Sequence, residues 1–276
     1  MADLFQILSR EYIRYAFIVG ITMSVCGALL GVSLVLKKHS MIGDGLSHVG
    51  FGAVAVAACF GFTPLAFAIP MVMLSSFLIL WLANKNKIFG DSAIAIFSTL
   101  ALAIGYASIE LSDGINFNVG NYLYGSLLGV SLTEVILSIV VAIIVVGLYI
   151  ILYNKIFSVT FDETFSKSTG TKTIAINIVI SILTSLTVVI GMKVMGALLI
   201  TSLIIFPTLS ARQITKTFKG VTIFAVIFSL ISFVIGLLAS CIITNLPIGS
   251  SIVFSSFILA MICFIIGKIG NLRKAS

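Results

Sequence analysis

The chain alternates between long apolar runs and short polar connections along almost its entire length. Each run holds ~18–24 residues, enough for a helix that crosses a bilayer at about 1.5 Å of rise per residue. The pattern predicts an all-α membrane protein with eight or nine spans, because two adjacent short runs can also form one broken helix. The nine candidate segments are residues 14–36, 43–62, 64–83, 92–111, 132–154, 174–192, 194–211, 221–244 and 250–267.

Composition agrees with this pattern and excludes a soluble domain. Of the 276 residues, 60% are hydrophobic and only 9% are charged, whereas soluble domains carry roughly 25% charged residues. The mean hydropathy is +1.26. We therefore expect one transmembrane domain over residues 1–276, in the cell membrane. The four cysteines lie singly in apolar stretches, which indicates small buried side chains and neither a disulfide frame nor a zinc site.

Basic residues divide unevenly between the two sides that nine spans define. One side receives 13 of the 16 lysines and arginines, and the other receives only Arg10, Arg14 and Lys193. Because basic residues accumulate in cytoplasmic loops, the first side should be cytoplasmic. The N-terminus is then outside and the C-terminus inside. The 13 residues are Lys37, Lys38, Lys85, Lys87, Lys155, Lys167, Lys172, Arg212, Lys216, Lys219, Lys268, Arg273 and Lys274.

The segment Met41–Gly52, MIGDGLSHVGFG, places a carboxylate and an imidazole in apolar surroundings. Asp44 and His48 are four residues apart and share one helix face. Ionisable residues at membrane depth indicate a functional site, and this pair is a partial ligand set for a divalent transition metal. The alternative is that Asp44 caps a helix and His48 hydrogen-bonds a neighbouring helix. The glycines around the pair, which favour the functional interpretation, are Gly43, Gly45, Gly50 and Gly52.

Two connections have sequences that indicate local structure. On the cytoplasmic side, Phe157–Thr173 is expected to form a short helix that Thr160 or Asp162 caps and Gly170 ends. Such a helix can dock a soluble partner, or it can be an ordinary surface loop. On the outer side, Leu111–Ser131 contains a stretch, Gly120–Gly129, that can form a short re-entrant or interfacial helix; the alternative is that Tyr122 and Tyr124 simply lie at headgroup level in an aromatic belt.

Pro207 lies inside the apolar run Met195–Ile214. It removes a backbone donor and predicts a kink or break in that span, with nearby hydroxyls bonding the freed carbonyls. Broken helices often line transport pathways, although a proline kink can also be purely structural.

Motifs for ATP binding and hydrolysis are absent from the sequence. No GxxxxGK[ST], HExxH or GxSxG pattern occurs. We therefore expect no enzymatic activity in this chain and no permanently bound cofactor.

Five segments together resemble the ABC-3 family, the integral-membrane permeases of ATP-binding-cassette importers for zinc, manganese or iron. The resemblance extends from about Phe17 to Lys268. Departures from the family pattern are small and remove no candidate ligand: Gly45, Gly50 and the run Thr208–Ser210. The five segments are KKHSMIGDGLSHVGFGAVAVA, IFGDSAIAIFSTLALAIG, NYLYGSLLGVS, FDETFSKSTG and VMGALLITSLIIFPTLSAR.

The resemblance implies a homodimeric permease with the type II importer architecture of the cobalamin and siderophore permeases. Its implied partners are an ABC ATPase subunit on the cytoplasmic face and an external metal-binding solute-binding protein, with no nucleic acid. It implies Asp44 and His48 as metal-contacting residues and the loop 155–173 as the coupling loop. The implied ATPase-coupling residues are Phe161, Asp162, Glu163, Ser168, Thr169 and Gly170.

Zinc is the expected cargo, with manganese or iron as the alternative. The span Met192–Leu203 resembles the zinc permeases more closely, and imidazole is a softer ligand than carboxylate. An ion-coupled secondary transporter is a second alternative, in which Asp44 and His48 relay protons. A permease for a bulky chelate, with a wide pathway lacking ligands, and a structural membrane protein fit the Asp/His pair poorly.

Overall fold

The computed structural model describes residues 11–84, 90–112, 125, 129–243 and 246–275, and these ranges contain helices and no strands. Nine of the described helices are long and apolar enough to span a membrane, in agreement with the upper end of the expected range. The helices are α2 Glu11–Leu36, α3 Ile42–Cys59, α4 Pro64–Asn84, α5 Gly90–Leu111, α7 Leu132–Ile151, α8 Tyr153–Phe161, α9 Glu163–Ser168, α10 Thr173–Met195, α11 Ala197–Ile214, α12 Phe218–Ile242 and α13 Ile248–Ala275.

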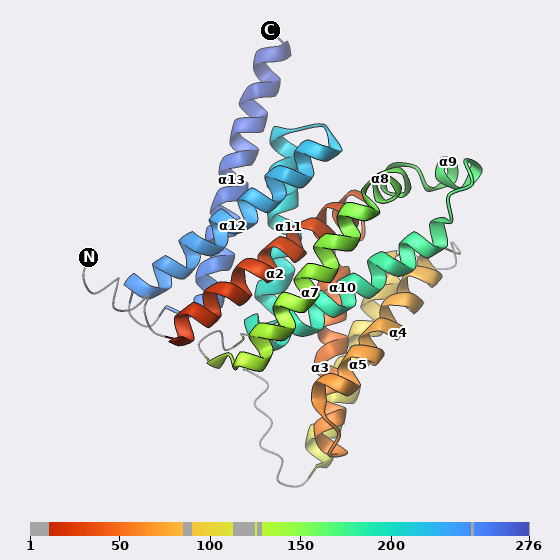
Figure 1. Ribbon diagram of the computed structural model, residues 1–276, viewed down its shortest axis with the longest axis vertical. Helices are drawn as coiled ribbons and strands as arrows, with labels where there is room; N and C mark the ends of the chain where they lie inside the picture. Colours follow the sequence, from red (N-terminus) through yellow and green to blue (C-terminus); the bar gives the residue numbers. More distant parts are fainter. Residues whose placement is uncertain (1–10, 85–89, 113–124, 126–128, 244–245, 276) are drawn as a thin grey trace.

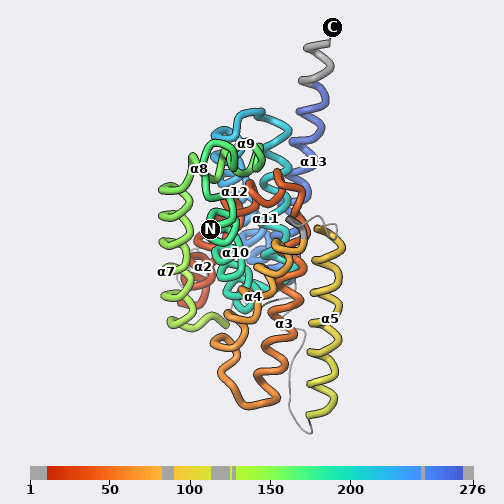
Figure 2. The backbone as a smooth tube through the Cα atoms, turned by 90° about the vertical axis from the view of Figure 1, so that its right-hand side faces the viewer, coloured from red at the N-terminus to blue at the C-terminus, as the bar shows by residue number. Residues whose placement is uncertain are grey.

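Helices α2, α3, α10 and α11 form the buried centre of the bundle. Figure 2 shows α7 and α5 on opposite sides of this centre. The outer helices α4, α5 and α13 have mostly exposed, apolar side chains. Side chains of this kind are expected where a helix faces lipid or another subunit.

The short helices α8 and α9, the connection between α11 and α12, and the C-terminal part of α13 lie at one end of the bundle (Figures 1 and 2). Lys37, which follows α2, lies at this end beside α9. Lys193 pairs with Glu134 at the opposite end, where α7 begins and α10 ends. The described basic loops thus share one end, as the charge pattern predicts for the cytoplasmic side.

Two interruptions differ from the expected boundaries. The fifth span ends at Ile151, and α8 begins at Tyr153 as a separate helix. The expected break at Pro207 is absent, because α11 continues through this residue. The chain is interrupted at Gly196, close to the predicted boundary between the spans 174–192 and 194–211, and its φ of 92° lies in a region that residues with a side chain rarely adopt.

Most of the stretch Gly120–Gly129 lies outside the described residues, so the expected helix there stays a prediction. Gly125 is described and packs directly against the Met195–Gly196 backbone, where a β-carbon would overlap the Met195 carbonyl. The following helix, α7, starts with a capping box between Ser131 and Glu134.

Candidate functional site

Asp44 and His48 both lie on α3, as the sequence predicts. Nε2 of His48 is 3.6 Å from Oδ2 of Asp44, which is too far for a hydrogen bond but close for two side chains on successive turns. The His48 side chain is 26% exposed and that of Asp44 is 39% exposed. The pair is therefore half-open in a helix whose other side chains are largely buried.

Asp44 does not occupy the capping position of α3. Met41 is the N-cap, and no side-chain hydrogen bond caps the helix. Asp44 lies in the first turn, where the helix dipole favours a negative charge. Its carboxylate oxygens are thus not used by a cap, which removes the first part of the structural alternative.

The other ring nitrogen of His48 finds no hydrogen-bond partner among the residues that the structure describes. Nδ1 is buried and unpaired within the described residues. The second part of the structural alternative, a hydrogen bond from His48 to a neighbouring helix, is therefore not observed in the described part of the chain. Buried polar atoms are normally paired, so His48 is not held in place by a structural hydrogen bond from Nδ1 in this part of the chain.

Glycines bring three neighbouring helices against α3. A β-carbon on Gly52 would overlap the backbone carbonyl of Ala101 on α5, and one on Gly45 would overlap the Ile94 side chain of the same helix. Gly43 faces Ile204 of α11, and Gly50 faces Met192 of α10. Because α3 is closely packed on these sides, Asp44 and His48 are left on the side that remains partly open.

Asp44 and His48 alone would form only a partial set of metal ligands. No group of three or more His, Cys, Asp or Glu side chains capable of holding a metal occurs in the described ranges. Zinc in proteins usually takes four ligands. Two side chains per chain therefore require further ligands from water or from a second copy.

The predicted cytoplasmic helix is present as two short helices, α8 and α9. Asp162 caps α9, with its Oδ1 accepting a hydrogen bond from the Phe165 backbone N–H at 2.8 Å. Thr160 lies within α8 and does not cap. Gly170, with φ of 83°, follows the α9 C-cap Thr169 and ends the helix as predicted.

The α8–α9 segment presents exposed aromatic side chains to its surroundings, with Phe157 of α8 also among the exposed ones. Phe161 and Phe165 are both largely exposed, at 60% and 62%. Ser166 faces inward, and its hydroxyl meets that of Ser158 at 2.6 Å. The inward side of the segment is thus held by the hydrogen bond between Ser158 and Ser166, and its outward side is apolar. Ser168 is also exposed.

Pro207 is buried in α11, away from the Asp44–His48 pair in sequence. Nearby hydroxyls were expected to bond the carbonyl that Pro207 leaves free. They instead donate hydrogen bonds to other carbonyls of α11, such as those of Ala197 and Ile204. These hydroxyls belong to Thr201, Ser202, Thr208 and Ser210.

The sequence did not single out the polar cluster that joins α9 to the bundle. Glu163, Lys37 and Asn177 contact one another, although they lie on three different segments. The family resemblance pointed to Glu163 as a coupling residue, and Lys37 was visible at the end of an apolar run, but no pattern linked the two. A polar Asn177 inside the run 174–192 was the one further signal available.

The arrangement is that of a polytopic helical membrane protein: apolar spanning helices surround a half-open ionisable pair, and a short helical element lies at one end. A family model described as the ABC 3 transport family matches residues 9–267. The chain therefore belongs to this family, and it is the membrane-spanning subunit of an ATP-binding-cassette transporter.

Individual relatives extend over almost the whole chain. It is 28% identical to the high-affinity zinc uptake system membrane protein ZnuB of Haemophilus influenzae, covering 92% of this chain and 97% of that protein. It is 26% identical to the manganese transport system membrane protein MntC of Halalkalibacterium halodurans, covering 98% and 92%. The solved structure of PsaBC from Streptococcus pneumoniae in complex with Fab matches with a TM-score of 0.83 at 25% identity, covering 95% of both chains. The match confirms the expected type II importer bundle.

Proposed function

We propose that this permease imports a divalent transition metal, with zinc as the cargo that its residues favour. The Asp44–His48 contact carries this proposal, because it offers a carboxylate oxygen and an imidazole nitrogen side by side within the membrane domain. A bulky organic chelate would need no such ligands. A free ion that has lost its hydration shell needs them.

The incompleteness of the site suits transport. An ion in transit must be held briefly and then released, so two contacts per subunit serve better than a closed four-ligand cage. In a homodimer, the pairs of two protomers would together supply four side chains. We therefore propose that the working permease is a homodimer.

Zinc is favoured over manganese or iron on ligand chemistry. Imidazole is a softer ligand than carboxylate and suits zinc, whereas manganese prefers oxygen ligands. The similarity to a zinc permease, at 28%, and to a manganese permease, at 26%, is nearly equal. Manganese or iron is therefore the alternative cargo.

The cargo is tested by measuring zinc, manganese and iron together in cells with and without this chain. Under zinc limitation, cells that lack the chain should hold less zinc, with manganese and iron unchanged. Restoring the chain from a plasmid should restore the zinc content. A loss of manganese in zinc-replete cells would overturn the zinc assignment, and three unchanged metals would contradict metal import altogether.

ATP hydrolysis would reside in a separate ATPase subunit that docks on α8–α9. The exposed Phe161 and Phe165 support this, since large apolar side chains at the basic, cytoplasmic end are otherwise unfavourable in water. A solute-binding protein would deliver the metal to the opposite end. An ion-coupled secondary transporter would need no docking surface for an ATPase.

Docking on α9 predicts that Phe165→Ala weakens co-purification of the ATPase with the permease. Removing a buried aromatic anchor from an interface costs about 2 kcal/mol or more, which corresponds to roughly a 30-fold loss of affinity. The matched control is Phe254→Ala on α13, because Phe254 is also 62% exposed but lies on a membrane-spanning helix. Equal ATPase recovery with both variants would exclude Phe165 from the interface.

A further inference from the structure

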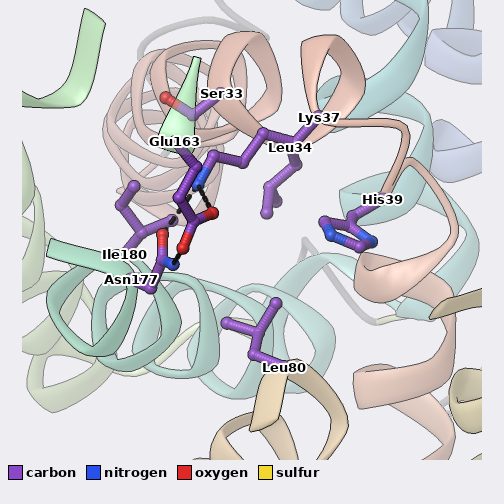
Figure 3. A pocket seen from close by; sticks show the side chains of 8 residues that line it. All are labelled: Ser33, Leu34, Lys37, His39, Leu80, Glu163, Asn177 and Ile180. Atoms are coloured by element: carbon purple, nitrogen blue, oxygen red, sulfur yellow. Dashed lines mark hydrogen bonds and ion pairs between the residues drawn. The ribbon is translucent and has the colours of Figure 1, made fainter. Parts of the chain in front are cut away.

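Glu163 belongs to a closed ring of three polar side chains at the cytoplasmic end of the bundle (Figure 3). Its Oε2 lies 3.6 Å from Nζ of Lys37, and its Oε1 accepts a hydrogen bond from Nδ2 of Asn177 at 3.0 Å. Lys37 Nζ closes the ring by donating to Oδ1 of Asn177 at 2.7 Å. Each member thus contacts the other two.

Two of the three ring members are largely removed from water, whereas the Glu163 side chain is 38% exposed. Asn177 is buried, and the side chain of Lys37 is only 14% exposed. The cavity beside the ring, which Ser33, His39 and Leu80 also line, measures about 20 Å³ and has room for about one water molecule. Burial lowers the pKa of Lys37, and the Glu163 carboxylate opposes this effect. The lysine charge therefore depends on Glu163 for its stabilisation.

The three side chains come from three segments with different roles. Glu163 is the first residue of α9, directly after the cap Asp162. Asn177 lies in the first turns of the central helix α10. Lys37 directly follows the last residue of α2 and begins the connection to α3.

That connection is short and tightly bonded. The Lys37 N–H donates to the Ser33 carbonyl at 3.2 Å and the His39 N–H to the Leu34 carbonyl at 2.8 Å, while Lys38 adopts a left-handed φ of 63°. The Ile42 N–H, at the start of α3, donates to the His39 carbonyl at 3.1 Å. A continuous set of contacts therefore runs from α9 through Lys37 to the helix that bears Asp44.

We propose that Lys37, Glu163 and Asn177 are positioning residues that couple movement of the ATPase-docking helix α9 to the metal-contacting helix α3. This rests on the proposed function, in which α9 docks an ATPase and α3 contacts the metal. When the ATPase shifts α9, Glu163 moves with it. Lys37 follows, because leaving it behind would strand a buried charge without its partner, and the rigid turn transmits the displacement to Asp44.

The test compares Glu163→Gln with wild type in proteoliposomes that contain permease, ATPase and solute-binding protein. Glutamine keeps the shape and can still accept the bond from Asn177, but it removes the charge that holds Lys37. Assembly is measured by co-purification of the ATPase, and in the assembled complex we expect the metal transported per hydrolysed ATP to fall at least about fivefold, the lower end of typical coupling energies. An unchanged ratio of metal to ATP would overturn the proposal.

The control is Glu134→Gln. This substitution weakens a comparable ion pair, in which Glu134 Oε1 lies 2.8 Å from Lys193 Nζ, at the end of the bundle away from α9. Its ratio of metal to ATP should equal that of wild type. A loss of equal size in the control would show that any broken ion pair lowers the ratio, and would also overturn the proposal.

A charge reversal covers the case in which Glu163→Gln does not assemble. The double variant Lys37→Glu with Glu163→Lys restores opposite charges, and it should transport more metal per ATP than either single reversal. Equal loss in all three would contradict coupling through this contact. If wild type itself shows no ATP-driven metal uptake, the proposed function fails. If wild type transports and Glu163→Gln transports equally well, only the coupling role fails.

Discussion

A His48→Ala permease is expected to lose most of its metal uptake while still assembling with the ATPase. The substitution removes one of the two proposed ligand side chains of each chain, and hence two of four in the proposed homodimer. Changes to groups that merely support a metal ligand cost about 10- to 100-fold, so removal of the ligand itself should cost at least as much. Uptake of radioactive zinc into proteoliposomes measures the effect.

Folding should survive this substitution. His48 is half-exposed, and its buried Nδ1 has no hydrogen-bond partner in the described part of the chain, so its removal leaves no polar group stranded. Val56→Ala is a suitable control, because Val56 is half-exposed on the same helix about two turns further on. Undiminished uptake by His48→Ala would refute a ligand role, and an equal loss in Val56→Ala would show a general effect of trimming α3.

Gly52→Ala is expected to destabilise the permease by separating α3 from α5. The new β-carbon would overlap the backbone carbonyl of Ala101, which cannot move aside as a flexible side chain can. The approach is equally close from the other side, where a β-carbon on Gly105 would lie 2.9 Å from the Gly52 Cα. Overpacking of this kind costs about 1–3 kcal/mol.

Gly147→Ala on α7 is the matched control for this prediction. Gly147 also lies inside a membrane-spanning helix, but a β-carbon there meets no atom within 4 Å. Both substitutions gain the same helix propensity, so their difference isolates the clash. In thermal unfolding of purified permease, the midpoint of Gly52→Ala should lie roughly 2–12 °C below that of Gly147→Ala. Identical midpoints would contradict the close α3–α5 contact.

The spanning helices could be predicted because the membrane imposes one simple requirement on each of them. A span needs about 20 apolar residues in succession, whatever its neighbours are, so the runs were visible in the sequence. The Asp162 cap was likewise visible, because capping involves only residues within one turn. The closeness of Asp44 and His48 was also predictable, because residues four apart on one helix lie on successive turns of the same face.

Contacts between distant segments could not be predicted in this way. Lys37 and Asn177 are 140 residues apart, and no local pattern links them. A break at Pro207 is likewise not observed, although the predicted boundary between the spans 174–192 and 194–211 lies close to the interruption at Gly196. Pro207 loses one backbone donor and the helix continues past it, whereas Gly196 adopts a backbone conformation that ends α10. A conformation of this kind depends on packing around the glycine, which the sequence does not display.

The most direct test of a metal-contacting role at this site is zinc uptake by Asp44→Asn, measured in proteoliposomes with the ATPase and the solute-binding protein. Asparagine keeps the shape of aspartate and serves about as well near a helix N-terminus, but its neutral amide is a far poorer ligand for a divalent metal. If Asp44 contacts the passing ion, Asp44→Asn should assemble normally and lose most of its uptake. Full zinc transport by Asp44→Asn would contradict a metal-contacting role for this pair.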